Sequence, residues 1–143
     1  MLIDELKNIA RNNGIVGAGG AGFPAYAKMT EKADTVILNC VECEPLLKLH
    51  RQLLATHTEE IIQMLDEVRE SFGAKEAVIG IKSEYVTTIK AIEEVIGDFP
   101  NVRICALKAA YPMGDEVVLI YEATGRVIKP GGLPIDENVV VYN

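Results

Sequence analysis

The stretch from position 14 to 24 reads GIVGAGGAGFP, with glycine at positions 14, 17, 19, 20 and 22. Because glycine has no Cβ, the backbone N–H groups of such a run can approach a ligand closely and adopt positive φ. Successive N–H groups form a concavity that binds anions such as a nucleotide phosphate. The run therefore predicts a nucleotide or flavin site. A flexible surface turn is the alternative, although a flexible linker rarely ends in an aromatic residue and a proline, as at Phe23-Pro24.

The glycines also match the pattern G-x-G-x-x-G at Gly17, Gly19 and Gly22. In an ordinary dinucleotide-binding loop, this pattern follows a strand and opens a helix. Residues 3–13 instead predict a helix, because their apolar residues recur at helical spacing, two acids fall in the first turn and Gly14 suits the end. We therefore exclude an ordinary Rossmann loop.

The rest of the chain alternates between strand and helix patterns. Short β-rich apolar runs predict strands at 35–39, 77–81, 102–107 and 139–142. Apolar stripes predict helices over 59–72 with Thr58 as N-cap, over 83–97 with Ser83 as N-cap, and over 114–124 with Gly125 at its end. Near-continuous apolar strands between helices indicate an α/β fold, a mainly parallel sheet with helices on both faces.

Composition excludes several classes of function. The net charge of −7 argues against nucleic acid as a partner, because phosphate backbones demand clusters of Lys and Arg. No apolar run reaches the roughly 18 residues that span a bilayer, and no signal peptide is visible. The 143 residues suit one domain, and three cysteines, an odd number, fit a reducing cytoplasm.

Cys40 and Cys43 form a C-x-x-C pattern, which is typical of a redox pair or of half a metal site. A zinc or iron–sulfur site needs four ligands. The chain offers only Cys105 besides, with His50 and His57 at no metal-binding spacing. The sequence therefore favours incidental cysteines and predicts no metal site, with the histidines on the surface of a helical segment.

Polar residues follow two of the predicted strands. Asn39, Glu42 and Glu44 follow the first strand, and the segment 111–116 follows the third. Ligands of open α/β sheets bind beyond the carboxyl ends of the strands, where carboxylates and an amide can bind ribose hydroxyls or flavin ring edges. Two plain alternatives stay open: a polar loop after the first strand, and acids that stabilise a helix N-terminus at Asp115 and Glu116.

Four of these motifs together resemble a known family. The run 17–28, Asn39 with the Glu-Cys-Glu-Pro of 42–45, the segment 111–126 and the Gly-Gly-Leu-Pro of 131–134 are similar to the 51-kDa, NADH-oxidising subunit of respiratory complex I. The resemblance is closer to its relatives: the RnfC subunit of ion-pumping ferredoxin:NAD oxidoreductases, the propanediol-utilisation cobalamin reductase and the proline-reductase-associated electron-transfer protein. Ala18 and Cys40 depart from the pattern, because complex I has arginine and relatives often have glycine there.

The resemblance implies a Rossmann-like domain that binds FMN and accepts a hydride from NADH. The backbone of the loop glycines would line the nucleotide pocket, Phe23 would stack on the NADH adenine and Lys28 would lie near a phosphate. Together with Phe23 and Lys28, the implied cofactor-binding residues are the loop glycines, the residues after the first strand, those that close the flavin pocket and an asparagine near the flavin phosphate: Gly17, Gly19, Gly20 and Gly22; Asn39, Glu42 and Glu44; Tyr111, Gly114, Asp115 and Glu116; and Asn143. No catalytic protein residue is expected, because the cofactor carries the chemistry.

Members of this family continue into a ubiquitin-like ligand-binding domain and a ferredoxin-type [4Fe–4S] domain. We therefore expect residues 1–143 to be one FMN- and NADH-binding domain of a longer protein. Its electrons would pass to partner subunits or to a ferredoxin-type domain, in the cytoplasm, at the inner face of a membrane or in a microcompartment, without direct membrane insertion. The alternative is a non-catalytic module that binds a nucleotide or docks partner subunits.

Overall fold

The computed structural model describes residues 1–17, 22–44 and 46–143. In these ranges four strands form one sheet in which every neighbouring pair is parallel. The strand order is β3-β2-β1-β4, and the strands are β1 (Thr35–Cys40), β2 (Glu76–Lys82), β3 (Val102–Leu107) and β4 (Val139–Tyr142). The predicted parallel α/β sheet is confirmed, and each predicted strand agrees to within a residue or so.

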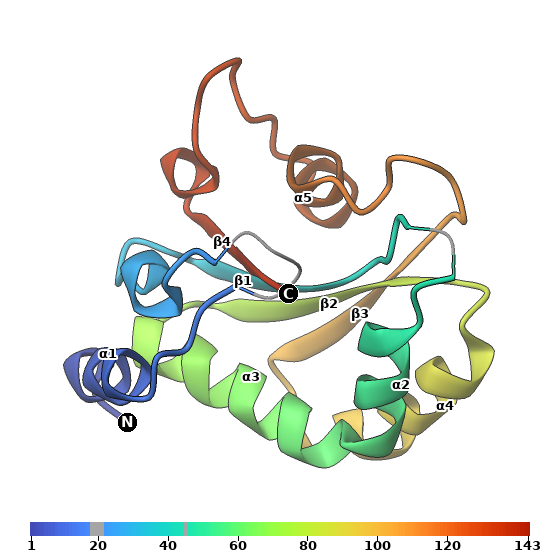
Figure 1. Ribbon diagram of the computed structural model, residues 1–143, viewed down its shortest axis with the longest axis horizontal. Helices are drawn as coiled ribbons and strands as arrows, with labels where there is room; N and C mark the ends of the chain where they lie inside the picture. Colours follow the sequence, from blue (N-terminus) through green and yellow to red (C-terminus); the bar gives the residue numbers. More distant parts are fainter. Residues whose placement is uncertain (18–21, 45) are drawn as a thin grey trace.

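Helices cover both faces of the sheet, as predicted, but unequally (Figure 1). On one face lie α1 (Ile3–Asn12), α2 (Leu49–Thr56), α3 (Thr58–Phe72) and α4 (Val86–Val95), and on the other lies α5 (Glu116–Thr124). Three short 3₁₀ turns complete the described elements: η1 (Ala25–Lys28), η2 (Ile96–Asp98) and η3 (Pro134–Glu137). No helix in the described ranges is long and apolar enough to cross a lipid bilayer.

Alternating side chains of the strands fill two separate cores. On β1, Val36 packs with the α1–α4 layer, whereas its neighbour Ile37 packs with α5. On β2, Ile79 packs with the α1–α4 layer and Val78 packs with α5. Successive side chains of a strand point to opposite faces, so a strand that is apolar at every position must be covered twice. This arrangement explains the continuous apolar runs in the sequence.

Two predicted helix caps are wrong. Thr58 is the first residue of α3, but its hydroxyl donates to the carbonyl of Leu54 in the preceding α2, so it does not cap α3. Tyr85 rather than Ser83 occupies the N-cap position of α4, and no side chain caps that helix. The predicted stop at Gly125 is confirmed, because it adopts the left-handed conformation with φ of 75°.

The direction in which successive strands are added to the sheet reverses between β1 and β4. From β1 the chain passes through α2 and α3 to β2, and from there through α4 to β3. It then crosses by α5 on the opposite face to β4, which pairs with the other side of β1. Such a reversal is the topological switch point at which open α/β sheets bind ligands, beyond the carboxyl ends of the strands.

An ion pair holds this crossover at the amino ends of the strands, where Asp34 immediately precedes β1. Arg126, just after α5, donates to both carboxylate oxygens of Asp34 at 2.6 and 3.2 Å, and to the carbonyl of Glu137 at 2.8 Å. Burial acts to raise the pKa of Asp34, but the hydrogen bonds from Arg126 and Thr35 hold that pKa below its ordinary value of 3.8. The pair therefore stabilises the fold at neutral pH.

We expect Arg126→Gln to lower the free energy of unfolding by about 1–3 kcal/mol at pH 7, because it removes charge-assisted hydrogen bonds. The folded-state pKa of Asp34 is depressed, so this contribution is present above its unfolded pKa and is lost as pH falls through the folded pKa. The free energies of unfolding of the variant and the wild type, measured with urea, should therefore converge as the pH is lowered from 7 to below 3.8. Lys90→Gln, on the exposed side of α4, serves as control. An equal difference at both pH values would contradict the role of Asp34.

Candidate functional site

The described ends of the glycine run, residues 14–17 and 22–24, are hydrogen-bonded to each other between α1 and η1. The N–H of Gly17 donates to the carbonyl of Phe23 at 2.7 Å, and the N–H of Gly22 donates to the carbonyl of Gly17 at 3.2 Å. A bond from the N–H of Ala25 to the carbonyl of Ile15 closes the base of the loop. The two described ends of the run are therefore held together by backbone hydrogen bonds. Gly19 and Gly20 lie outside the described residues.

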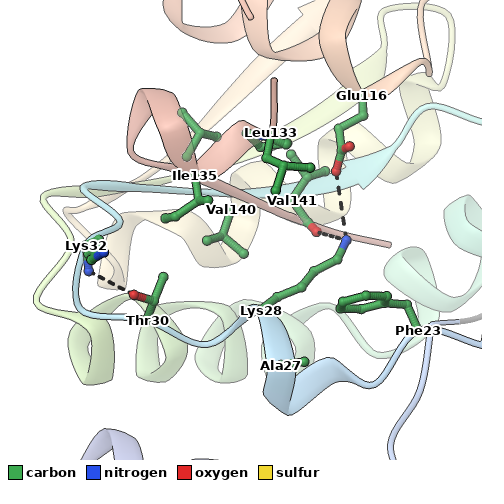
Figure 2. A pocket seen from close by; sticks show the side chains of 12 residues that line it. Phe23, Ala27, Lys28, Thr30, Lys32, Glu116, Leu133, Ile135, Val140 and Val141 are labelled. Atoms are coloured by element: carbon green, nitrogen blue, oxygen red, sulfur yellow. Dashed lines mark hydrogen bonds and ion pairs between the residues drawn. The ribbon is translucent and has the colours of Figure 1, made fainter. Parts of the chain in front are cut away.

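Lys28, at the end of η1, reaches across to β4 and α5 (Figure 2). Its ammonium nitrogen Nζ donates to the carbonyl of Val141 at 3.1 Å and lies 3.8 Å from Oε1 of Glu116. The same nitrogen lies 5.7 Å from the centre of the Phe23 ring. Three predicted site residues, which come from two separate motifs, therefore meet at one point.

A cavity of about 390 Å³ opens beside this point, along the side of β4 that faces away from β1 (Figure 2). Its volume falls within the range of small-molecule sites, and its walls are mainly apolar with a few polar groups, which is typical of such sites. The lining residues come from η1 and its flanks, α5, η3 and β4: Phe23, Ala27, Lys28, Thr30, Lys32, Glu116, Leu133, Pro134, Ile135, Val139, Val140 and Val141.

The sequence does not predict most of the residues that line this cavity as part of a site. Leu133 and Pro134 belong to the Gly-Gly-Leu-Pro run, which contributes to the resemblance but carries no predicted role in the site. The sequence predicts Val139–Val141 only as part of a strand. A signal for them exists all the same: an apolar strand at the edge of a sheet needs cover on its open side.

Asn39, at the end of β1, joins the two strand-exit segments. Its amide nitrogen donates to the carbonyl of Gly114 at 3.0 Å, and its amide oxygen accepts from the N–H of Val41 at 3.1 Å. The N–H of Gly114 in turn donates to Sγ of Cys43 at 3.2 Å. The structure thus brings Asn39 and Gly114 together, although neither of them lines the cavity.

Glu42 is buried, with only 6% of the residue exposed. Its Oε1 accepts from the N–H of His50 in the first turn of α2 at 2.9 Å, and its Oε2 lies 3.9 Å from Nε of Arg51. Among the described residues, Oε2 has no hydrogen-bond partner. Buried acceptors normally have a partner, so this oxygen is available to a donor from water or a ligand. His50, predicted on the surface, is half-buried, whereas His57 is exposed.

The remaining predicted residues lie around the same carboxyl edge of the sheet. Asp115 caps α5, because its carboxylate accepts from the N–H groups of Val117 and Val118. This cap is the helix-stabilising role that the sequence offers as an alternative for Asp115, and it is compatible with a contact to a cofactor. Glu44, Tyr111 and Asn143 are exposed, and none of them lines the cavity.

The three cysteines are free thiols. Cys40 is buried, and burial, together with the nearby Glu42 carboxylate, raises the pKa of its thiol to about 12. It therefore stays protonated at neutral pH, whereas a redox thiol needs its thiolate form. Within the described ranges, no three His, Cys, Asp or Glu side chains gather where they could hold one metal ion.

Known proteins match this chain over almost its whole length. The family model described as the Nuo51 FMN-binding domain matches residues 10–143. Cobalamin reductase PduS of Citrobacter freundii is 39% identical over 138 residues, covering 96% of this chain and 30% of that protein. A component of the Na⁺-translocating ferredoxin:NAD⁺ oxidoreductase complex of Acetobacterium woodii is 36% identical over 144 residues, covering 98% of this chain and 32% of that protein.

A solved structure agrees with these matches. An NAD⁺-reducing [NiFe]-hydrogenase in its air-oxidised state superposes with a TM-score of 0.81 at 25% identity, covering 99% of this chain and 28% of the hydrogenase chain. The chain thus spans about a third of the length of the relatives it matches. The relatives are oxidoreductases by name, and the expected resemblance is confirmed. This chain belongs to the family of the Nuo51 FMN-binding domain.

Proposed function

We propose that this chain binds FMN and NADH as the flavin domain of an electron-transfer oxidoreductase, and that it positions the two for hydride transfer. The observation that carries the proposal is the cavity in which Phe23, Lys28 and Glu116 meet. These residues come from two distant motifs, and the sequence predicts that both motifs form one site. Membership of the FMN-binding family supports the proposal.

The described residues fit such a cofactor. An apolar slot along β4 suits the flat ring of a flavin or an adenine, and the Phe23 ring at its mouth is half-exposed and free to stack. Lys28 supplies the positive charge that a phosphate needs in a chain of net charge −7. Outside the cavity, the buried Oε2 of Glu42 lies 3.9 Å from Arg51 and has no hydrogen-bond partner among the described residues, so it can accept a hydrogen bond from a hydroxyl or ring N–H.

Bound FMN would supply a hydride acceptor, a chemistry that protein side chains lack. The contribution of this chain would then be to bind and orient. Lys28 would hold a phosphate, Phe23 would hold a base, and the apolar walls of β4 and η3 would exclude water from the reacting faces. Electron-transfer partner subunits or an iron–sulfur domain would receive the electrons.

Titration of the purified chain into FMN, followed by flavin fluorescence, tests the proposal. We expect saturable binding, and then bleaching of the oxidised-flavin absorbance when NADH is added without oxygen. Binding without bleaching would place NADH recognition outside these residues. No binding to this chain or to a longer natural protein that contains it would favour the non-catalytic docking module and overturn the proposal.

A further inference from the structure

Gly114 is held on both sides of its backbone. Its N–H donates to Sγ of Cys43, and its carbonyl accepts from the amide of Asn39. We propose that Cys43 is a positioning residue of the cofactor site, whose sulfur holds Gly114, and with it the start of α5, against the loop that follows β1. The inference rests on the proposed function, because it concerns the same site.

Gly114 and the loop that follows β1 pack too closely to admit a side chain at position 114. A Cβ placed on Gly114 would lie 2.1 Å from the carbonyl oxygen of Val41 and 2.6 Å from Sγ of Cys43. The backbone of Gly114 therefore lies directly against the loop. Asn39 is fixed in turn, because its amide oxygen accepts from the N–H of Val41. The sulfur and the amide thus form a two-point clamp on one peptide segment.

The clamp is connected to the cavity through consecutive residues. Asp115, which follows Gly114, caps α5, and Glu116 then lines the cavity and lies 3.8 Å from Nζ of Lys28. Cys43 itself does not line that cavity. Its effect on a bound cofactor must therefore pass through Gly114 and the first turn of α5.

The C-x-x-C pattern receives a structural explanation in this way. A thiol sulfur is a weak hydrogen-bond acceptor and a compact, polarizable side chain. Cys43 uses the sulfur for the Gly114 N–H, while Cys40 fills the core beneath the sheet. The two cysteines therefore have separate structural roles, in which Cys43 holds Gly114 and Cys40 packs in the core.

Amide hydrogen exchange of Gly114 in the cofactor-free protein tests the clamp directly. Because one neutral hydrogen bond contributes roughly 0.5–1.5 kcal/mol, we expect Cys43→Ala to speed exchange at Gly114 by about 2- to 10-fold. Cys43→Ser keeps an acceptor and should recover part of the protection. Cys105→Ala is the matched control, since that thiol lies on β3 and contacts the carbonyl of Glu122. Unchanged Gly114 exchange in Cys43→Ala would overturn the inference.

The effect on the cofactor is measured on the same variants. We expect Cys43→Ala to weaken FMN binding about 2- to 10-fold and to shift the visible absorption of bound flavin, with Cys43→Ser in between and Cys105→Ala like wild type. Equal losses in the serine and alanine variants would show that side-chain volume matters rather than the acceptor, against the inference. If wild type binds no FMN, the proposed function fails, whereas the exchange experiment still decides the role of Cys43.

Discussion

Gly114→Ala is expected to lose FMN binding and to lower the free energy of unfolding by about 2–4 kcal/mol. The new methyl group would lie 2.1 Å from the carbonyl oxygen of Val41, a backbone atom that no rotamer change can move. The two strand-exit segments must therefore separate, which breaks the hydrogen bonds from Asn39 and to Cys43. Urea unfolding and FMN titration measure the two effects.

Two other glycines give matched controls. A Cβ on Gly97 would meet nothing within 4 Å, so Gly97→Ala should change stability by less than about 0.5 kcal/mol. A Cβ on Gly80 would lie 2.7 Å from a terminal carbon of Leu119, a flexible side chain that can shift, so Gly80→Ala should cost less than Gly114→Ala. Wild-type stability and FMN affinity in Gly114→Ala would show that the two segments do not touch.

Lys28→Met is expected to weaken FMN binding by about 10- to 100-fold. Methionine keeps much of the apolar stem but removes the ammonium group, and a hydrogen bond to a charged group contributes roughly 1.5–3 kcal/mol. Lys28 is also well placed to release its present partners, because its pair with Glu116 is half-exposed and such pairs contribute little. Flavin fluorescence titration at low and physiological salt measures the loss.

Lys90→Met is the control for this experiment, because it removes the same charge from the exposed side of α4, outside the cavity. If the two variants bind FMN equally well, the phosphate does not lie at Lys28. If both lose affinity equally, the effect comes from net charge and disappears at higher salt. Loss in Lys28→Met alone, persisting at physiological salt, supports the assignment.

The sheet was predictable because its signal is local. The central residues of the first two strands, 36–38 and 77–81, are apolar without interruption, and such short runs favour a strand covered on both faces. The stop at Gly125 was predictable for a similar reason, since the left-handed conformation favours glycine. The predicted cap at Thr58 is wrong because a neighbouring helix competes for its hydroxyl, which donates to the carbonyl of Leu54 in α2.

The candidate site was predictable only in part. Lys28, Phe23 and Glu116 carry recognisable motifs, and the structure brings them to one cavity. The far wall at Leu133–Ile135 depends on where the chain passes after α5, which no local pattern records. The contact of Gly114 with Cys43 spans 71 residues of sequence and depends on a missing Cβ, so only the folded chain reveals it.

The position of β4 has one more consequence. Among the described strands it lies at the end of the sheet, and its residues Val139–Tyr142 are three valines and a tyrosine. An uncovered apolar border strand is a template on which another chain can pair and start aggregation. The Lys28 ammonium on the Val141 carbonyl occupies one of these pairing positions. The lysine that would recognise a ligand therefore also leaves one backbone acceptor fewer on β4 for another chain to pair with.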